Sequence, residues 1–308
     1  MSREKIIIGS RGSRLALSQA ETVVASLKNS YPEKAFEIKK IATAGDLNRN
    51  VQLDRLDSIG IFTKKLEEAL LDGRIDLAVH SLKDMPTIIP DQLYLAAVLE
   101  RSDPRDILVT CGELLNELRP GSRIGTGSPR RSIQLSRYRP DLEARSIRGN
   151  IDTRLKKIQS GEVDGVVLAA AAMIRLGWQE KITQYLAVED FLPSVGQGAI
   201  AIEMRRNEDY LQELVSQINH LPTWQCITAE RVFLSTLGGG CRAPIAALAS
   251  INGEQLHLEG MAASSDGTKI LRISGEGMIA SAGETGRDLA KELLAMGASE
   301  FIKEAAVN

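Results

Sequence analysis

Short apolar runs alternate with amphipathic stretches through the first two thirds of the chain. The amphipathic stretches have helical spacing; in the first of them Leu17, Ala20, Val24 and Leu27 mark one face. The apolar runs predict strands at residues 5–8, 76–79, 107–110, 123–126, 144–147, 165–168 and 199–203. This alternation is typical of parallel α/β domains.

The pattern changes near Ala243. Three runs at 244–249, 255–261 and 269–274 alternate or continue as strands, and they are separated by Asn-Gly and Asp-Gly pairs that favour hairpin turns. A helical stretch over about 284–296 follows. We therefore expect two α/β domains followed by a small α+β domain.

Length and composition narrow the class of protein. A chain of 308 residues is too long for one ordinary core, so two or three domains are expected. The longest apolar run, 166–174, is too short to cross a bilayer, and the three isoleucines near the start are too few for a secretory signal. We expect a cytoplasmic protein without membrane contact.

The metal-binding and disulfide-forming residues are few. Three cysteines without an export signal make a disulfide framework improbable, and Cys111 and Cys226 are interpreted as core residues. Three scattered histidines and no closely paired cysteines predict no metal site.

Positive charge is concentrated in one segment. Between Arg119 and Lys157 eleven basic residues face three acidic ones, a net charge of +8 in a chain whose total is −2. Nucleic acid is one candidate anion, but single-strand binding favours interleaved aromatic residues, and Tyr138 is the only one here. A small polyanionic ligand fits better.

Residues just after the strands are the candidates for ligand binding, because α/β sheets bind ligands beyond the carboxyl ends of their strands. Lys83 and Asp84 follow the second predicted strand, and Pro86 prevents a helix there. They form either a solvated loop or a carboxylate placed against a cationic reaction centre.

The segment Gly127-Ser128-Pro129-Arg130-Arg131 follows the 123–126 strand. Serine before proline predicts Ser128 at the N-cap and Pro129 at the first helical position, an end to which anions bind readily. Arg130 and Arg131 add forked donors suited to carboxylates or phosphates.

Other strand exits carry similar residues. Asn150 is a predicted N-cap with Arg154 one turn into its helix. Ser13 is either a simple cap or an anion ligand, and Gln197 either marks a tight crossing or donates to a ligand. The remaining candidates at these exits are Arg11, Arg148 and Arg175. Each alone fits an ordinary surface residue, but their convergence favours a site.

Cys241 follows three glycines, Gly238 to Gly240. A free cysteine is most often a small buried hydrophobe, but glycines open the approach to its sulfur, and a thiolate there could attack an electrophilic carbon. No Cys-His protease signature accompanies it.

Six of these segments, in order over nearly the whole chain, resemble the porphobilinogen deaminase (hydroxymethylbilane synthase) family. They are Gly9-Ser10-Arg11, Ala78-Val79-His80-Ser81-Leu82-Lys83-Asp84-Met85-Pro86, Gly125-Thr126-Gly127-Ser128-Pro129-Arg130-Arg131, Ile147-Arg148-Gly149-Asn150-Ile151-Asp152-Thr153-Arg154, Leu192-Pro193-Ser194-Val195-Gly196-Gln197-Gly198-Ala199 and Gly239-Gly240-Cys241. The chain departs from the family pattern at Ala44 and Ile59, where basic residues are usual.

The resemblance implies a transferase that condenses four porphobilinogen molecules head to tail, releases ammonia at each step and yields hydroxymethylbilane. It implies a dipyrromethane cofactor bound to Cys241 as a thioether, and a cytoplasmic monomer. The implied fold has two domains like periplasmic binding proteins around a cleft, at 1–99 with 199–219 and at 104–194, and a third domain at 221–308.

The resemblance also implies roles for single residues. Asp84 would stabilise the cationic azafulvene left when ammonia departs. The residues implied to bind cofactor or substrate are Arg11, Ser13, Lys83, Thr126, Ser128, Arg130, Arg131, Arg148, Arg154, Arg175 and Gln197. A non-catalytic module that binds small polycarboxylate ligands is the alternative.

Overall fold

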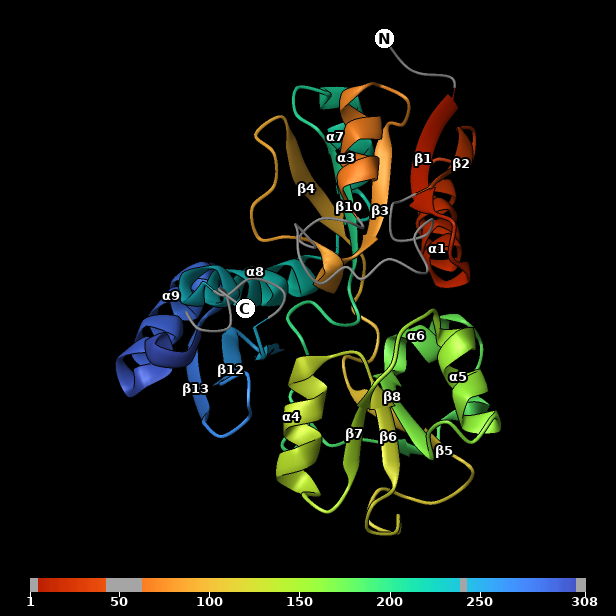
Figure 1. Cartoon of the computed structure of the whole chain (residues 1–308). Helices are drawn as coiled ribbons and strands as arrows, with labels where there is room; N and C mark the ends of the chain where they lie inside the picture. The colour runs from red at the N-terminus through yellow and green to blue at the C-terminus, as the bar shows by residue number, and fades with distance from the viewer. Residues whose placement is uncertain (1–4, 43–62, 239–242, 303–308) are drawn as a thin grey trace. The chain divides into compact units, whose positions relative to one another are not determined.

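Three β-sheets form the framework of the computed structural model, which describes residues 5–42, 63–238 and 243–302 (Figure 1). The chain divides into two units. Unit 1 is Met1–Ser102 with Ala199–Trp224, and unit 2 is Asp103–Gly198 with Gln225–Asn308. The sequence-based division into three domains stays a prediction.

Unit 1 contains a five-stranded sheet in the order β2-β1-β3-β10-β4. Its strands are β1 (Lys5–Arg11), β2 (Ala35–Ile41), β3 (Leu77–Ser81), β4 (Leu93–Val98) and β10 (Ile200–Arg205). Its helices are α1 (Arg14–Ser30), α3 (Lys64–Leu71) and α7 (Asp209–Ser216), with a 3-10 turn η1 (Leu82–Asp84) directly after β3.

Alternating side chains of this sheet fill two cores. Ile6 and Ile8 pack with α1 and α7 on one face, through residues such as Val23 and Leu214. The other face packs against α3, where Leu66, Ala69 and Leu70 are fully buried. Helices therefore cover both faces, as the near-continuous apolar strands require.

Unit 2 contains a second five-stranded sheet, in the order β7-β6-β8-β5-β9. Its strands are β5 (Asp106–Thr110), β6 (Arg123–Thr126), β7 (Glu143–Ser146), β8 (Gly165–Ala169) and β9 (Gln184–Tyr185). Its helices are α4 (Pro129–Tyr138), α5 (Ile151–Gln159) and α6 (Ala170–Arg175). Leu135 of α4 belongs to the core on one face of the sheet, and Leu155 of α5 and Met173 of α6 belong to the core on the other. Figure 1 shows α4 on one side of these strands and α5 and α6 on the other.

The third sheet is an antiparallel meander, β11-β12-β13. Its strands are β11 (Ile245–Asn252), β12 (Gln255–Ala263) and β13 (Ile270–Met278), and it shares a core with α8 (Leu221–Leu237) and α9 (Ala282–Leu293). A β-carbon on Gly260 would lie 2.3 Å from the ring of Phe233, so glycine is needed for α8 to approach the sheet.

The predicted class, two α/β sheets followed by a small α+β domain, is confirmed. The sheets are mixed, however, because β10 runs antiparallel to β3 and β4, and β5 runs antiparallel to β8. Strand direction depends on long-range connections that apolar periodicity does not report. Strands β2, β4 and β9 were not expected.

The burial of the cysteines and the length of the apolar helices were also predicted from the sequence. Cys226 is buried as expected, but Cys111 is exposed, so its assignment to the core was wrong. Within the described ranges no helix is long and apolar enough to cross a membrane.

Candidate functional site

The first group of predicted site residues lies at one edge of the unit 1 sheet. Strands β1 and β3 are parallel neighbours, so Arg11 at the end of β1 and the η1 turn after β3 emerge at the same edge. Arg11, Ser13 and Asp84 line one small cavity of about 60 Å³, with His80 in its wall. Asp84 is exposed and Lys83 is half-buried.

Ser13 is the N-cap of α1, one of the two roles considered for it from the sequence. Its hydroxyl oxygen accepts a hydrogen bond from the amide of Ala16 at 3.2 Å. Behind it the hydroxyl of Ser81 and the side chain of Gln19 exchange hydrogen bonds of 2.8 and 3.1 Å, which ties the end of β3 to α1. The cavity wall is thus fixed by contacts between two elements.

The second group lies at one edge of the unit 2 sheet. Thr126 at the end of β6 is paired with Ser146 at the end of β7 in parallel register. Because β5 is antiparallel to β8, Asp106 at the start of β5 pairs with Ala169 at the end of β8 and joins the same edge. Within unit 2 these strand exits therefore lie at one edge of the sheet, as the sequence predicted for them.

Hydroxyl and guanidinium groups gather here. Ser128 is the N-cap of α4 with Pro129 at the helix start, but its side chain makes no capping bond, and its amide donates to Thr126 Oγ1 at 3.2 Å. A β-carbon on Gly127 would lie 2.8 Å from the carbonyl oxygen of Ile147 and 3.5 Å from a terminal nitrogen of Arg154. Glycine therefore allows the exits of β6 and β7 to approach closely.

Arg148 and Arg154 follow β7, whose exit lies close to that of β6. Arg148 is exposed, and Arg154 is half-buried with Nε donating to the carbonyl of Gly149 at 2.9 Å. Asn150 is the N-cap of α5, as predicted.

Arg130 and Arg131 are buried and share one carboxylate. Arg130 donates to Asp106 Oδ2 at 2.8 Å, and Arg131 donates to Oδ1 at 2.7 and 3.0 Å. Burial raises the pKa of the Asp106 carboxyl, but the charges and hydrogen bonds of both arginines outweigh burial and hold that pKa well below its usual range. The three charges sum to +1, so the cluster keeps a positive charge below the surface.

Gln197 completes this cluster. Its Nε2 donates to Asp106 Oδ1 at 2.8 Å and to the carbonyl of Pro104 at 2.7 Å, which uses both amide hydrogens. Its Oε1 accepts from Arg131 at 3.3 Å. Asp106 was not predicted as a site residue from the sequence, although a carboxylate at the start of an apolar strand was a usable signal.

Arg175 ends α6 near the same loop. One terminal nitrogen donates to the carbonyl of Gly198 at 2.6 Å. Burial lowers the pKa of Arg175 to about 10. A guanidinium held with so little water is suited to receiving an anion.

Glu230 of α8 was also missed. It is fully buried, and its two oxygens accept from the amides of Gly196 at 2.7 Å and Ala249 at 2.9 Å. This carboxylate fastens the loop that carries Gln197 to the C-terminal sheet.

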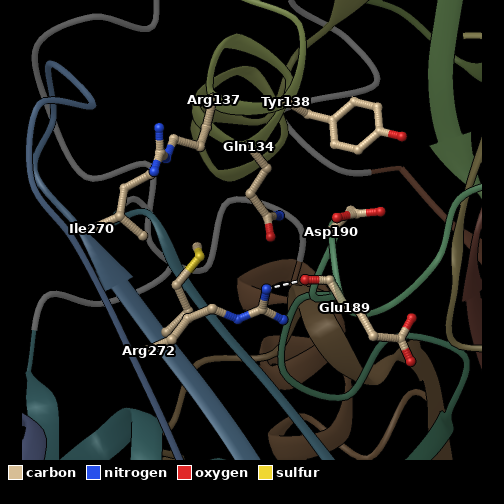
Figure 2. Close-up of a pocket in the computed structure, with 8 residues that line it drawn as sticks. Gln134, Arg137, Tyr138, Glu189, Asp190, Ile270 and Arg272 are labelled. Atoms are coloured by element: carbon tan, nitrogen blue, oxygen red, sulfur yellow. Dashed lines mark hydrogen bonds between the residues drawn. The ribbon is translucent and has the colours of Figure 1, made fainter. Parts of the chain in front are cut away.

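A larger cavity of about 390 Å³ lies elsewhere in unit 2, between α4 and the C-terminal sheet (Figure 2). Arg272 spans it by donating to the backbone carbonyls of Glu189 and Val188 and by pairing with Glu259 at 2.7 Å. None of the predicted site residues lines this cavity. We do not assign it to the reaction.

Cys241, Ala44 and Ile59 lie outside the described residues. Within the described part of the chain, no three histidine, cysteine or acidic side chains are grouped so that they could hold a metal ion.

Fold and site together define an α/β protein that gathers arginine and hydroxyl side chains at the exits of its strands. The porphobilinogen deaminase, dipyromethane cofactor binding domain matches residues 6–213, and the porphobilinogen deaminase, C-terminal domain matches residues 224–295. The chain therefore belongs to the porphobilinogen deaminase family.

Individual relatives agree with this assignment. The porphobilinogen deaminase of Alkaliphilus metalliredigens is 45% identical over 97% of this chain and 95% of its own. That of Syntrophus aciditrophicus is 46% identical over 93% of this chain and 94% of its own. That of Clostridioides difficile is 45% identical over 94% of this chain and 97% of its own.

Similarity to solved structures is weaker. The periplasmic aliphatic sulphonate binding protein SsuA from Escherichia coli matches 75% of this chain and 70% of its own at a TM-score of 0.39 and 16% identity. The BenM effector binding domain matches 71% of this chain and 91% of its own, at a TM-score of 0.43 and 17% identity. Such scores add nothing to the assignment of the site.

Proposed function

We propose that this chain condenses four porphobilinogen molecules head to tail, with release of ammonia, to give hydroxymethylbilane. Membership of the porphobilinogen deaminase family at about 45% identity over nearly the full length supports this reaction. The observation in the fold that supports it most directly is the gathering of arginine and hydroxyl donors at the carboxyl edge of the unit 2 sheet.

The substrate explains why so many donors are present. Each porphobilinogen carries an acetate and a propionate, so every condensation adds two carboxylates that must be held. Arginine forks bind carboxylates through two parallel hydrogen bonds and stay protonated. We assign this role to Arg11, Arg148, Arg154 and Arg175.

The donor set of unit 2 also fits a dipyrromethane cofactor, which brings four carboxylates. Ser128 has a hydroxyl that makes no capping bond, and Thr126 lies beside it. The buried cluster of Arg130, Arg131 and Asp106 carries one net positive charge, which favours an anion nearby. The cofactor supplies the pyrrole carbon to which the first substrate is joined, and we propose Cys241 as its thioether attachment.

Within this proposal the buried residues support the ligand-binding groups. Arg131 donates through Nε, Nη1 and Nη2 to Asp106, Gln197 and the carbonyl of Val167, whereas Arg130 donates through Nη1 alone, to Asp106 and the carbonyl of Leu192. Gln197 donates both amide hydrogens to groups of the protein, Asp106 and the carbonyl of Pro104. Arg131 and Gln197 therefore mainly supply charge and hold the strand exits in place, and hydrogen bonds to carboxylates fall to Ser128, Thr126, Arg130 and the less buried arginines.

Asp84 is the proposed catalytic carboxylate. Loss of ammonia from porphobilinogen leaves a cation, and an exposed carboxylate beside Arg11 and Ser13 can stabilise that charge as it develops. It can also accept the proton that leaves the attacked pyrrole carbon. Lys83, next to it, is proposed to bind a substrate carboxylate together with Ser13.

The direct test is turnover of purified protein with porphobilinogen, with ammonia and linear tetrapyrrole measured together. One ammonia per porphobilinogen and a tetrapyrrole product support the proposal. Binding of porphobilinogen without ammonia release would instead support a non-catalytic module. We further propose that the protein is a cytoplasmic monomer. Light scattering of the purified protein measures its molar mass and so tests the monomeric state.

A further inference from the structure

A buried histidine and a buried glutamate join two strands of the unit 1 sheet beside the cavity that Asp84 lines. His80 of β3 and Glu203 of β10 place Nε2 and Oε2 3.0 Å apart, with side chains 4% and 0% exposed. In the antiparallel register His80 pairs with Ala201, so Glu203, two residues further, lies diagonally across on the same face.

The stability of the fold does not explain this pair. Taking two ionisable groups out of water costs several kcal/mol each, and apolar residues of similar volume are often as stable or more so. Oε1 of Glu203 is buried and has no hydrogen-bond partner in the described structure, which adds to that cost. A costly pair at this position suggests a use in the adjacent cavity.

His80 connects the pair to the candidate site. It lines the same small cavity as Arg11, Ser13 and Asp84, and it lies four residues before Asp84 along the chain. A carboxylate hydrogen-bonded to one imidazole nitrogen fixes the orientation of the ring and favours its protonated form.

The charged surroundings of His80 come from four elements. Glu203 belongs to β10, Arg11 ends β1, Asp84 ends η1 and Glu67 belongs to α3. Burial raises the pKa of Glu67, a hydrogen bond with Thr63 opposes that rise, and the charge of Glu203 adds to it. Three of these four groups are acidic and Arg11 is basic, and Glu203 is the one whose hydrogen bond to the imidazole is defined.

We propose that Glu203 holds the imidazole of His80 as a cation at the wall of this cavity, and that His80 is a positioning residue that keeps Asp84 ionised and oriented. This inference rests on the proposed function. A cation in the wall of the cavity that Asp84 lines would stabilise the carboxylate form, the form required both to stabilise developing positive charge and to accept a proton.

Glu203→Gln tests the electrostatic part, because it keeps the shape of the side chain and removes its charge. We expect kcat to fall about tenfold with KM nearly unchanged, and the acidic limb of the kcat profile to move about one unit to higher pH, since one pH unit and a tenfold change are the same free energy. His80→Gln should lower kcat and move the acidic limb in the same way. His80→Lys retains a cation, so its acidic limb should lie closer to that of the wild type.

Ile202→Ala provides the matched control, since Ile202 is fully buried in the same strand. It should lower the thermal midpoint without moving the acidic limb. If Glu203→Gln leaves that limb in place, or if Ile202→Ala moves it equally, the proposal is overturned.

A second measurement does not depend on turnover. With ¹⁵N-labelled histidine, the His80 signal at neutral pH should show both ring nitrogens protonated in the wild type and a neutral ring in Glu203→Gln. A neutral ring in the wild type would overturn the positioning role even if the enzyme is active, whereas an inactive wild type with a protonated His80 would count only against the proposed reaction.

Discussion

Asp106 Oδ1 lies 2.7 Å from a terminal nitrogen of Arg131, and both side chains are almost completely buried. Arg130 pairs with the other oxygen of the same carboxylate at 2.8 Å. One acidic residue thus compensates two guanidinium groups at the start of β5.

Asp106→Asn should destabilise the protein strongly. The amide leaves two buried guanidinium groups without a counter-charge, and breaking a buried pair in this way costs about 3–5 kcal/mol. Chemical denaturation measures the change in the free energy of unfolding. Asp141→Asn is the matched control, because Asp141 pairs with Arg139 at 2.6 Å near the surface and should have a much smaller effect.

The same variant has a defined pH dependence. The pKa of Asp106 is lowered in the folded state, so its contribution is fully present above the unfolded value near 3.8 and is lost as the pH falls below it. The stability difference between wild type and Asp106→Asn should be constant above about pH 5 and should narrow below that. A difference that stays constant down to the acid unfolding transition would show that folding does not lower the pKa of the Asp106 carboxyl.

Ser13 and Ser128 occupy the same helix position but should respond differently to alanine. Ser13 accepts a capping hydrogen bond from Ala16, so Ser13→Ala should lower the free energy of unfolding by about 1 kcal/mol. Ser128 makes no capping bond, so Ser128→Ala should change stability little and should instead weaken the retention of the cofactor. Unchanged retention of the cofactor in Ser128→Ala would contradict a ligand-binding role for Ser128.

Asp84→Asn should reduce turnover without affecting folding. Asp84 is exposed, so the amide should leave the thermal midpoint unchanged. Loss of a carboxylate that stabilises charge and moves a proton should lower kcat by about 10² to 10⁴. Asp91→Asn, an exposed aspartate of the same unit, serves as the control, and a normal rate in Asp84→Asn would remove Asp84 from the mechanism.

Arg175→Met should separate binding from stability. Burial lowers the pKa of Arg175, which means that the folded protein holds this cation at a cost, so the variant should be at least as stable as the wild type. Loss of a charged hydrogen bond to substrate should raise KM about tenfold or more. Arg145→Met, which removes an exposed arginine paired with Glu143, should leave KM unchanged.

The sequence predicted those parts of the site that depend on local order along the chain. Ser13, Ser128 and Asn150 were expected as N-caps because each follows an apolar run and precedes a helical pattern, and all three are N-caps. Their roles toward a ligand remain predictions.

The long-range pairs could not be predicted in the same way. Asp106 and Glu203 are single acidic residues beside or within apolar strands, and their partners are 24 and 123 residues away in the sequence. Which partner each one meets depends on sheet order and strand direction, and the antiparallel placement of β10 was itself not expected.

The central claim, a porphobilinogen-condensing enzyme primed by a group bound to Cys241, is tested most directly by the intact mass of the denatured protein. Protein made in cells that produce porphobilinogen should exceed the mass of its sequence by one dipyrromethane and should give the colour reaction of a free pyrrole, and Cys241→Ser should show neither. An unmodified mass for the wild type, or the same added mass in Cys241→Ser, would contradict the claim.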